Sequence, residues 1–222
     1  MSTEASELKK IAEGREAEMF AWGDGKVLRL YRHGWGPAED GEMNRLKVAR
    51  VCGVRVPAEF GRHDLDGRAG LVMERISGPD LLVELGNKPW RLLQVGGLWG
   101  RVQAEMNSKR APPDLESARD RARRLIESSE RIPADIRDAA LRAVESLPFG
   151  DRLLHGDCHP ANIMRHGDEL VIIDWSNVCR GPAEADLPEL LDVHPGRSPS
   201  WNPMADQDDG ALREAPPARY IQ

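Results

Sequence analysis

Two neighbouring stretches of this sequence decide its fold: Leu153–Met164, which reads LLHGDCHPANIM, and Val171–Trp175, which reads VIIDW. Both contain short apolar runs that predict buried strands. Asp157 and Asn162 lie between two of these runs, on what we expect to be one tight loop. Asp174 ends a run of four apolar residues, which is how a buried strand delivers a carboxylate to a cleft. We therefore expect the three polar side chains to meet in one place.

These side chains have the types and the spacing that phosphoryl transfer requires. One acid must accept the proton of the attacking hydroxyl, and a second acid with an amide oxygen must hold Mg²⁺ against the phosphates. We assign the first role to Asp157 and the metal-ligand roles to Asn162 and Asp174. His155 lies two residues before the base, where it can hold the loop by hydrogen bonds from a packed position.

Other interpretations of the same loop stay open. Taken alone, each of the three polar residues would suit a turn, a helix cap or a strand end. His155, Asp157 and His159 together would suit a metallophosphatase-like site, although the other clusters of Asp, Asn and His that such a site needs are absent from the sequence. Cys158 is interpreted as a small packing residue, because no arrangement of neighbours makes it a nucleophile.

The first third of the chain predicts a small sheet with one helix. Asp24-Gly25 between two apolar runs predicts a hairpin of strands 16–22 and 26–31. In the second strand Arg29 shares a face with Val27, so it either faces water at an edge or points into a cleft. A helix is expected over Glu39–Val51, with an apolar stripe formed by Met43, Leu46 and 48–51 and with Gly53 as its cap. Two more strands are expected over 54–60 and 68–74.

The remainder predicts a mainly helical unit that begins after a linker at Ile76–Asp80. Leu81–Leu85 is expected to be a short apolar turn, followed by helices over 89–107, 113–130 and 133–147 and by the start of another at 182–191. The core face expected for the first of these helices consists of Leu92, Leu93, Val95, Leu98, Trp99, Val102 and Met106. Four arginines at 119, 121, 123 and 124 alternate with acids and favour a solvated helix face over an anion site.

The net charge of −6 at pH 7 gives no electrostatic reason to expect nucleic acid or an anionic membrane as a partner. No window approaches the roughly 20 consecutive apolar residues of a membrane span. Met1–Lys10 is polar and lacks the apolar core of a signal peptide. The three cysteines form neither a disulfide framework nor a zinc pattern. We therefore expect a cytoplasmic location and neither a nucleic-acid nor a membrane partner.

The loop 155–162, which reads HGDCHPAN, and the strand end Ile173-Asp174-Trp175 resemble the aminoglycoside phosphotransferase family, the small-molecule branch of the protein-kinase-like fold. The resemblance extends from about Ile11 to Leu191. It implies an α+β, two-lobed fold: a small antiparallel β N-lobe over residues 1–78 and a mainly helical C-lobe over 79–192. The family's further C-terminal helices are expected to be missing, and residues 193–222 are expected to be disordered.

The resemblance also implies roles for residues outside the central stretch. Arg29 occupies the position of the phosphate-binding lysine that the family usually has in its third strand. Glu42 resembles the glutamate that pairs with this lysine. Met73, Glu74 and Ile76 lie in a segment that resembles the hinge, whose backbone would read adenine, and Asp186 matches an acid that braces the catalytic loop.

The activity implied is an ATP-dependent, Mg²⁺-requiring phosphotransferase that phosphorylates a hydroxyl of a small molecule. The alternative is a truncated or non-catalytic nucleotide-binding member, comparable to a pseudokinase, which Arg29 and the short C-terminus would favour. The sequence does not name the acceptor. Aminoglycosides, choline, homoserine, thiamine, sugars and fructosamines are all acceptors within the family.

Overall fold

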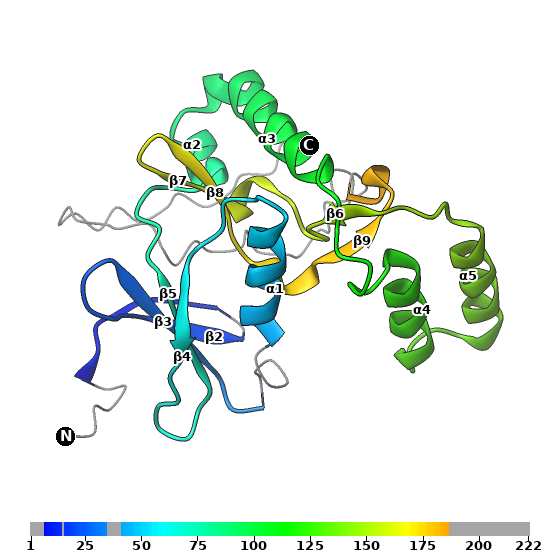
Figure 1. The fold of residues 1–222 in the computed structure, drawn as a ribbon, viewed down its shortest axis with the longest axis horizontal. Coiled ribbons are helices and arrows are strands. Elements are labelled where there is room, and N and C mark those ends of the chain that lie inside the picture. The colour runs from blue at the N-terminus through cyan, green and yellow to red at the C-terminus, as the bar shows by residue number, and fades with distance from the viewer. Residues whose placement is uncertain (1–6, 15, 35–40, 187–222) are drawn as a thin grey trace, which may run out of the picture.

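The glycines around Asp24 form the turn that the sequence predicts, and the sheet of the N-lobe is built outward from it. The computed structural model describes residues 7–14, 16–34 and 41–186 of the 222-residue chain. Gly23 and Gly25 have φ angles of +64° and +66°, which glycine adopts without strain. Strands β2 and β3 pair antiparallel across this turn. The sheet order is β1-β2-β3-β5-β4 (Figure 1). Its strands are β1 (Lys10–Glu13), β2 (Ala17–Ala21), β3 (Lys26–Tyr31), β4 (Glu59–Arg62) and β5 (Gly70–Glu74).

The two faces of β3 have different neighbours, as the alternation of strand side chains requires. Leu28 and Leu30 are buried in a small outer cluster of the sheet. Val27 is buried in the main core, and Arg29 shares its face. Arg29 therefore points toward the rest of the molecule rather than toward water at an edge.

Helix α1 (Gly41–Val51) lies between the sheet and the C-lobe (Figure 1). It ends as predicted, because Gly53 has a φ of +82° and the N–H of Val54 donates to Ala49 O. Leu46 of the predicted apolar stripe is buried, but Val51 is 83% exposed. The stripe was wrong at this position, because Val51 is the last residue of the helix and its side chain faces solvent. Residues 39 and 40 of the predicted helix lie outside the described residues.

The strand predicted over 54–60 was wrong in its first half, since β4 begins only at Glu59. Pro57 has no N–H to contribute to a ladder. Arg55 instead accepts a hydrogen bond at its backbone oxygen from the N–H of Ile172 in the C-lobe, at 3.2 Å. The strand predicted over 68–74 begins later, at Gly70, because Leu65 and Arg68 close a turn by exchanging backbone hydrogen bonds.

The C-lobe contains four helices and two small β-ladders within the described residues. The segment predicted as a short turn at Leu81–Leu85 is a helix, because Asp80 caps it by accepting the Val83 N–H at 2.7 Å. The two ladders pair β6 with β9 and β7 with β8. Short 3-10 turns lie at Pro89–Arg91, Pro160–Asn162, Trp175–Asn177 and Ala183–Asp186. The helices and strands are α2 (Leu81–Asn87), α3 (Leu92–Asn107), α4 (Ala118–Ser128), α5 (Ala134–Ser146), β6 (Arg152–Leu154), β7 (Ile163–His166), β8 (Glu169–Ile172) and β9 (Cys179–Gly181).

Helix α3 buries Val95 and Met106 as predicted, but Leu92 and Leu93 are 60% and 90% exposed. These two residues lie in the first turn, and the buried side chains of α3 come from Val95 onward. Helices α4 and α5 form a hairpin that extends to one side of the molecule (Figure 1). Each arginine of α4 has a partner, so the structure gives no support to an anion site, the alternative that the sequence disfavoured. The pairs are Arg119 with Val144 O, Arg121 with Asn177, Arg123 with Glu145 and Arg124 with Glu116.

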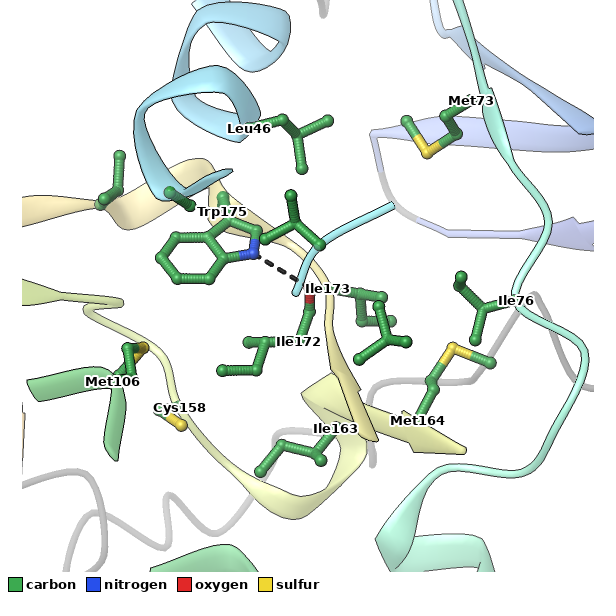
Figure 2. Packing of buried hydrophobic residues seen from close by; sticks show 14 of the residues in the cluster. Leu46, Met73, Ile76, Met106, Cys158, Ile163, Met164, Ile172, Ile173 and Trp175 are labelled. Atoms are coloured by element: carbon green, nitrogen blue, oxygen red, sulfur yellow. Dashed lines mark hydrogen bonds between the residues drawn. The ribbon is translucent and has the colours of Figure 1, made fainter. Parts of the chain in front are cut away.

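One hydrophobic core runs through both lobes around the fully buried Trp175 (Figure 2). Leu46 and Met73 enter it from the N-lobe and Ile163 from the C-lobe. The indole N–H of Trp175 donates to Ile172 O at 3.0 Å, which holds the ring in this position. The lobes therefore share apolar contacts behind the expected cleft. No helix in the described part of the chain is long and apolar enough to cross a membrane.

Candidate active site

The loop between β6 and β7 brings two of the predicted site residues together. The side-chain amide of Asn162 donates to the backbone oxygen of Asp157 at 2.9 Å. The loop also closes through the Asn162 N–H, which donates to His159 O at 2.9 Å. Because the NH₂ end of the Asn162 amide is used inside the loop, the Oδ1 end is directed away from this contact. An amide oxygen is a ligand that Mg²⁺ accepts.

His155 supports this loop from a fully buried position. Its Nε2 lies 2.9 Å from Ile173 O, and its Nδ1 accepts the N–H of Asp157 at 3.2 Å. This pattern requires a neutral ring with the proton on Nε2. Burial lowers the pKa of His155 despite the nearby carbonyl of Ile173 and carboxylate of Asp186, so the ring stays neutral. His155 thus connects the predicted base to the residue that precedes Asp174.

The carboxylate of Asp186 holds the same loop by accepting hydrogen bonds from the loop's backbone. Its Oδ2 accepts the His155 N–H at 2.9 Å and its Oδ1 accepts the Gly156 N–H at 2.8 Å. The side-chain amide of Asn107 also donates to Oδ2, at 2.7 Å, and Gln103 donates to the backbone oxygen of Asp186 at 2.8 Å. These distances agree with the bracing role that the resemblance implies.

Asn107 and Gln103 were missed by sequence reasoning. Both are buried on α3, four residues apart and thus on one face of the helix. The available signal was the presence of two polar residues on a helix face that is otherwise apolar, which indicates that they have polar partners in the interior. Gly156 was also not singled out. Its φ is +75°, and a Cβ at this position would lie 2.4 Å from the backbone oxygen of Asn177.

Asp174 occupies a strained position at the end of β8. Its φ of +60° is left-handed, which is uncommon for a residue other than glycine and occurs at sites where the surroundings impose it. The hydroxyl of Ser176 donates to its Oδ1 at 2.6 Å. Burial raises the pKa of this carboxyl, but the charge of Arg29 and the Ser176 hydroxyl outweigh burial and lower it overall. Asp174 is therefore an anion at neutral pH, as a metal ligand must be.

Arg29 and Glu42 form an ion pair beside Asp174. Arg29 Nη1 lies 2.9 Å from Glu42 Oε1, and the two side chains are only 17% and 7% exposed. Burial raises the pKa of Glu42, and the guanidinium of Arg29 offsets part of this effect. Burial disfavours the charged form of Arg29, but Glu42 and Asp174 together raise its pKa overall. The arginine thus carries its charge between two acids from different lobes.

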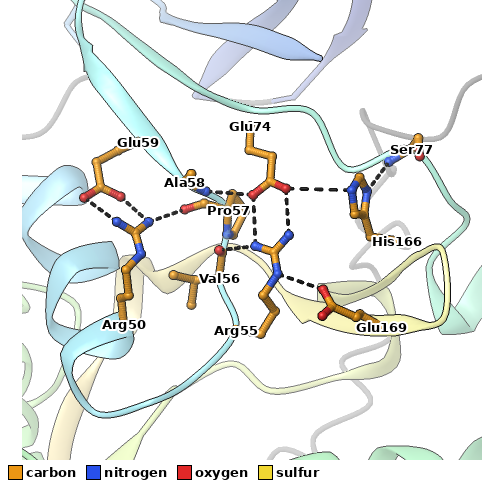
Figure 3. A network of polar contacts seen from close by, with 10 residues as sticks. All are labelled: Arg50, Arg55, Val56, Pro57, Ala58, Glu59, Glu74, Ser77, His166 and Glu169. Atoms are coloured by element: carbon orange, nitrogen blue, oxygen red, sulfur yellow. Dashed lines mark hydrogen bonds and ion pairs between the residues drawn. The ribbon is translucent and has the colours of Figure 1, made fainter.

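The predicted hinge, residues 73–76, begins in the last two residues of β5 and continues beyond the strand. Met73 and Ile76 are buried in the shared core. The N–H groups of Glu74 and Arg75 donate to Ala58 O and Gly25 O, at 2.7 and 2.9 Å. The Glu74 carboxylate turns toward Arg55, with two contacts of 2.9 and 2.6 Å (Figure 3). The hinge segment is therefore held from both sides.

The donor set of this site fits a hard divalent cation. Asn162 and Asp174 offer oxygen ligands, and the N–H of Ile173 donates to Asn162 O at 2.9 Å, so the two residues lie on adjacent backbone. His159 Nε2 lies 3.6 Å from Asp157 Oδ1, but the described residues contain no group of three or more His, Cys, Asp or Glu side chains that could hold a metal ion. The metallophosphatase-like interpretation therefore finds no support in this part of the chain.

Some of the predictions fall where the structure does not test them. The predicted helix over 182–191 corresponds to the 3-10 turn Ala183–Asp186 and then leaves the described residues. The predicted disorder of 193–222 and the missing C-terminal helices also lie outside the described residues. The lobe boundary at 78 falls in the segment between β5 and α2 and stays a prediction. The catalytic and ligand roles of the site residues likewise remain predictions.

Comparison with protein families gives a match over most of the chain. A family model described as the phosphotransferase enzyme family matches residues 7–220. A search of curated proteins found no significant match in sequence.

Solved structures with the same fold include kinases of several small molecules. A choline/ethanolamine kinase family protein from Mesorhizobium loti is 18% identical, with 82% of this chain and 62% of that chain covered and a TM-score of 0.54. An amicoumacin kinase in complex with AMP-PNP and Ca²⁺ is 16% identical, with 86% and 64% covered and a TM-score of 0.54. An aminoglycoside-3′-phosphotransferase of type VIII is 20% identical, with 81% and 73% covered and a TM-score of 0.54. The chain thus spans a little under two thirds of the length of the first two proteins. At these identities the likeness confirms the two-lobed, protein-kinase-like fold.

Proposed function

From the membership of this chain in the phosphotransferase enzyme family, we propose that it transfers a phosphoryl group from ATP to a hydroxyl of a small molecule, with Mg²⁺ as cofactor. The observation that carries the proposal is the meeting of Asp174 with the Asn162 loop on one side and with the Arg29–Glu42 pair on the other. Phosphoryl transfer is catalysed mainly by positioning and charge, and this arrangement supplies both.

Each residue has one task in this proposal. Asp157 accepts a hydrogen bond from the acceptor hydroxyl and takes its proton as the oxygen attacks the γ-phosphorus. The bond from the γ-phosphorus to the bridging oxygen breaks, and ADP leaves with that oxygen. Asn162 and Asp174 would hold the cation, which when bound neutralises charge between the phosphate oxygens. Arg29 contributes a positive charge to the phosphates, and Glu42 keeps its guanidinium in place.

The nucleotide base would lie against the hinge between Met73 and Ile76. The N–H groups of Glu74 and Arg75 are already used within the N-lobe. In this proposal another backbone group of the hinge therefore reads adenine. His155 and Asp186 do not touch the substrates, but they hold the Asp157 loop in position.

The acceptor is proposed only at the level of a hydroxylated small molecule. The names of the structurally similar proteins include an amicoumacin kinase and an aminoglycoside phosphotransferase, so the shared fold is compatible with different acceptors. The proposal further places the protein in the cytoplasm, where ATP is plentiful, without a nucleic-acid or membrane partner.

A second candidate function is nucleotide binding without efficient turnover. Arg29 favours it, because arginine is larger than lysine, planar and forked, and here one end of it is committed to Glu42. The variant Arg29→Lys separates the two candidates. The proposed enzyme should gain no activity from this change, whereas a large gain would show that the native arginine hinders turnover.

The proposed function is tested with purified full-length protein. We expect Mg-ATP to bind in titration calorimetry and to be converted to ADP faster in the presence of one member of a panel of hydroxylated small molecules. Asp157→Asn should abolish phosphate transfer and leave Mg-ATP affinity within about threefold, because the base touches the acceptor rather than the nucleotide. Unchanged turnover in this variant would refute the role of Asp157.

A further inference from the structure

The hairpin of β7 and β8 connects the two ends of the proposed nucleotide site. At its open end, Asn162 directly precedes β7 and Asp174 follows β8 by two residues. At its closed end, His166 pairs with Glu169 across the turn. The proposed metal ligands therefore lie at the open end of a short, hydrogen-bonded hairpin.

The closed end of this hairpin is held by the hinge through Arg55 (Figure 3). The guanidinium of Arg55 donates to both oxygens of Glu74, at 2.9 and 2.6 Å, and its Nε donates to Glu169 Oε2 at 3.1 Å. Arg55 thus lies between a carboxylate at the end of β5 and a carboxylate at the start of β8. Its backbone oxygen also accepts the N–H of Ile172, so both its side chain and its backbone join the two lobes.

His166 and Gly78 form a second set of contacts between hinge and hairpin. His166 Nε2 lies 3.7 Å from Glu74 Oε1, and its Nδ1 lies 3.4 Å from the N–H of Ser77. The N–H of Gly78 donates to Arg165 O at 3.0 Å. A Cβ at Gly78 would lie 2.4 Å from that oxygen, so the two backbones are in close contact. These contacts therefore hold the hinge against the hairpin.

We propose that Arg55 is a positioning residue that ties the hinge to the β7–β8 hairpin and so sets the placement of Asn162 and Asp174 relative to the bound nucleotide. The inference rests on the proposed function, because it assigns the contacts a role in Mg-ATP binding. The pair with Glu74 is bidentate and belongs to a network, which is the arrangement in which a partly exposed ion pair has a measurable effect. Arg55 touches neither nucleotide nor metal in this proposal.

Arg50 provides a matched control for Arg55. It also donates to both oxygens of a glutamate, Glu59, and to Pro57 O at 2.9 Å (Figure 3). These contacts lie wholly within the N-lobe. Arg50→Gln and Arg55→Gln therefore remove the same kind of ion pair, but only the second change removes contacts between the hinge and the hairpin.

The test measures the Mg²⁺ concentration that gives half-maximal ATP binding. Arg55→Gln should raise this concentration by about fivefold or more, the size expected for losing a bidentate charged contact, while Arg50→Gln stays within about twofold of wild type. Glu169→Gln, which keeps the Arg55–Glu74 pair, should give an intermediate increase. Arg55→Lys should recover only part of the loss, because lysine cannot reach both carboxylates with a planar fork.

Hydrogen exchange of the protein without nucleotide supplies a readout that does not depend on activity. The amides of Gly78 and Arg165 should exchange faster in Arg55→Gln than in Arg50→Gln. Equal behaviour of the two variants in both measurements would overturn the inference. If wild-type protein fails to bind Mg-ATP, the proposed function is refuted, and unchanged exchange in Arg55→Gln then separately refutes the tie between hinge and hairpin.

Discussion

Arg29 Nη1 lies 2.9 Å from Glu42 Oε1, in an ion pair that joins strand β3 to helix α1. The charge of Arg29 also lowers the pKa of Asp174, which belongs to the other lobe. One guanidinium therefore pairs with an acid on an N-lobe helix and stabilises the anion of a second acid just after β8. This relationship makes the pair important for stability as well as for the proposed binding of phosphate.

Removal of one member of this pair should destabilise the protein more than removal of both. Arg29→Met leaves Glu42 buried without a countercharge, and we expect the free energy of unfolding to fall by about 3 kcal/mol. The double variant Arg29→Met/Glu42→Leu should recover most of this loss but not the affinity for Mg-ATP. Urea denaturation and titration calorimetry measure the two quantities. A single variant as stable as wild type would contradict a buried, charged pair.

The stability of the protein should fall on acidification because of His155. Its pKa is lowered by burial, so below about pH 6.5 the unfolded chain binds a proton that the native ring does not. The contribution of His155 is thus fully present above that pH and is lost as the pH falls toward the native pKa. In this range the free energy of unfolding can fall by up to about 1.4 kcal/mol per pH unit because of this one group.

The measurement compares the free energy of unfolding at pH 7.5 and pH 5.5 for wild type and His155→Gln. The variant should be less stable at the higher pH and should show the smaller decrease between the two. Other histidines are common to both proteins and cancel in the comparison. Equal decreases would show that His155 does not control this part of the pH dependence.

A methyl group at Gly156 should disrupt the loop 155–162. Both Gly156 and Gly167 have positive φ, but only Gly156 would place a Cβ 2.4 Å from a backbone atom, the oxygen of Asn177. Gly167→Ala is the control and should cost about 1 kcal/mol from the left-handed backbone alone. Gly156→Ala should cost at least about 3 kcal/mol, since overpacking adds to that strain. Similar unfolding midpoints for the two variants would contradict the close approach.

The proposed metal site predicts a charge-specific effect at Asp174. Asp174→Asn removes the anion that the site needs, so the Mg²⁺ concentration for half-maximal ATP binding should rise by at least about tenfold. Asp168→Asn removes the same charge from the exposed turn of the β7–β8 hairpin and should have no comparable effect. Isothermal titration at several Mg²⁺ concentrations distinguishes them. Equal changes in the two variants would indicate a general electrostatic effect in place of a ligand.

Much of the site could be predicted because its residues are close together in the sequence. Asp157 and Asn162 share one loop, and apolar runs on either side define the strands that deliver them. The αL conformation at Gly53 and the turn around Asp24 are also local properties of glycine and its neighbours. Errors occurred where local pattern competed with long-range contacts, as at Arg55, whose backbone pairs with β8 and not with a neighbouring N-lobe strand.

By itself, the sequence determined the loop 155–162 and the strand that precedes Asp174, because these depend on apolar periodicity and on side-chain chemistry at short spacing. The class of fold followed from the resemblance of these motifs to a known family. Only the tertiary structure decided whether Arg29 faces water or Glu42 in the interior, which polar residues of α3 hold Asp186, and how Arg55 connects the hinge to the hairpin. These relationships join residues separated by tens of positions or more. Their energies arise from burial and charge in the folded state, and no local pattern records which distant partner will provide them.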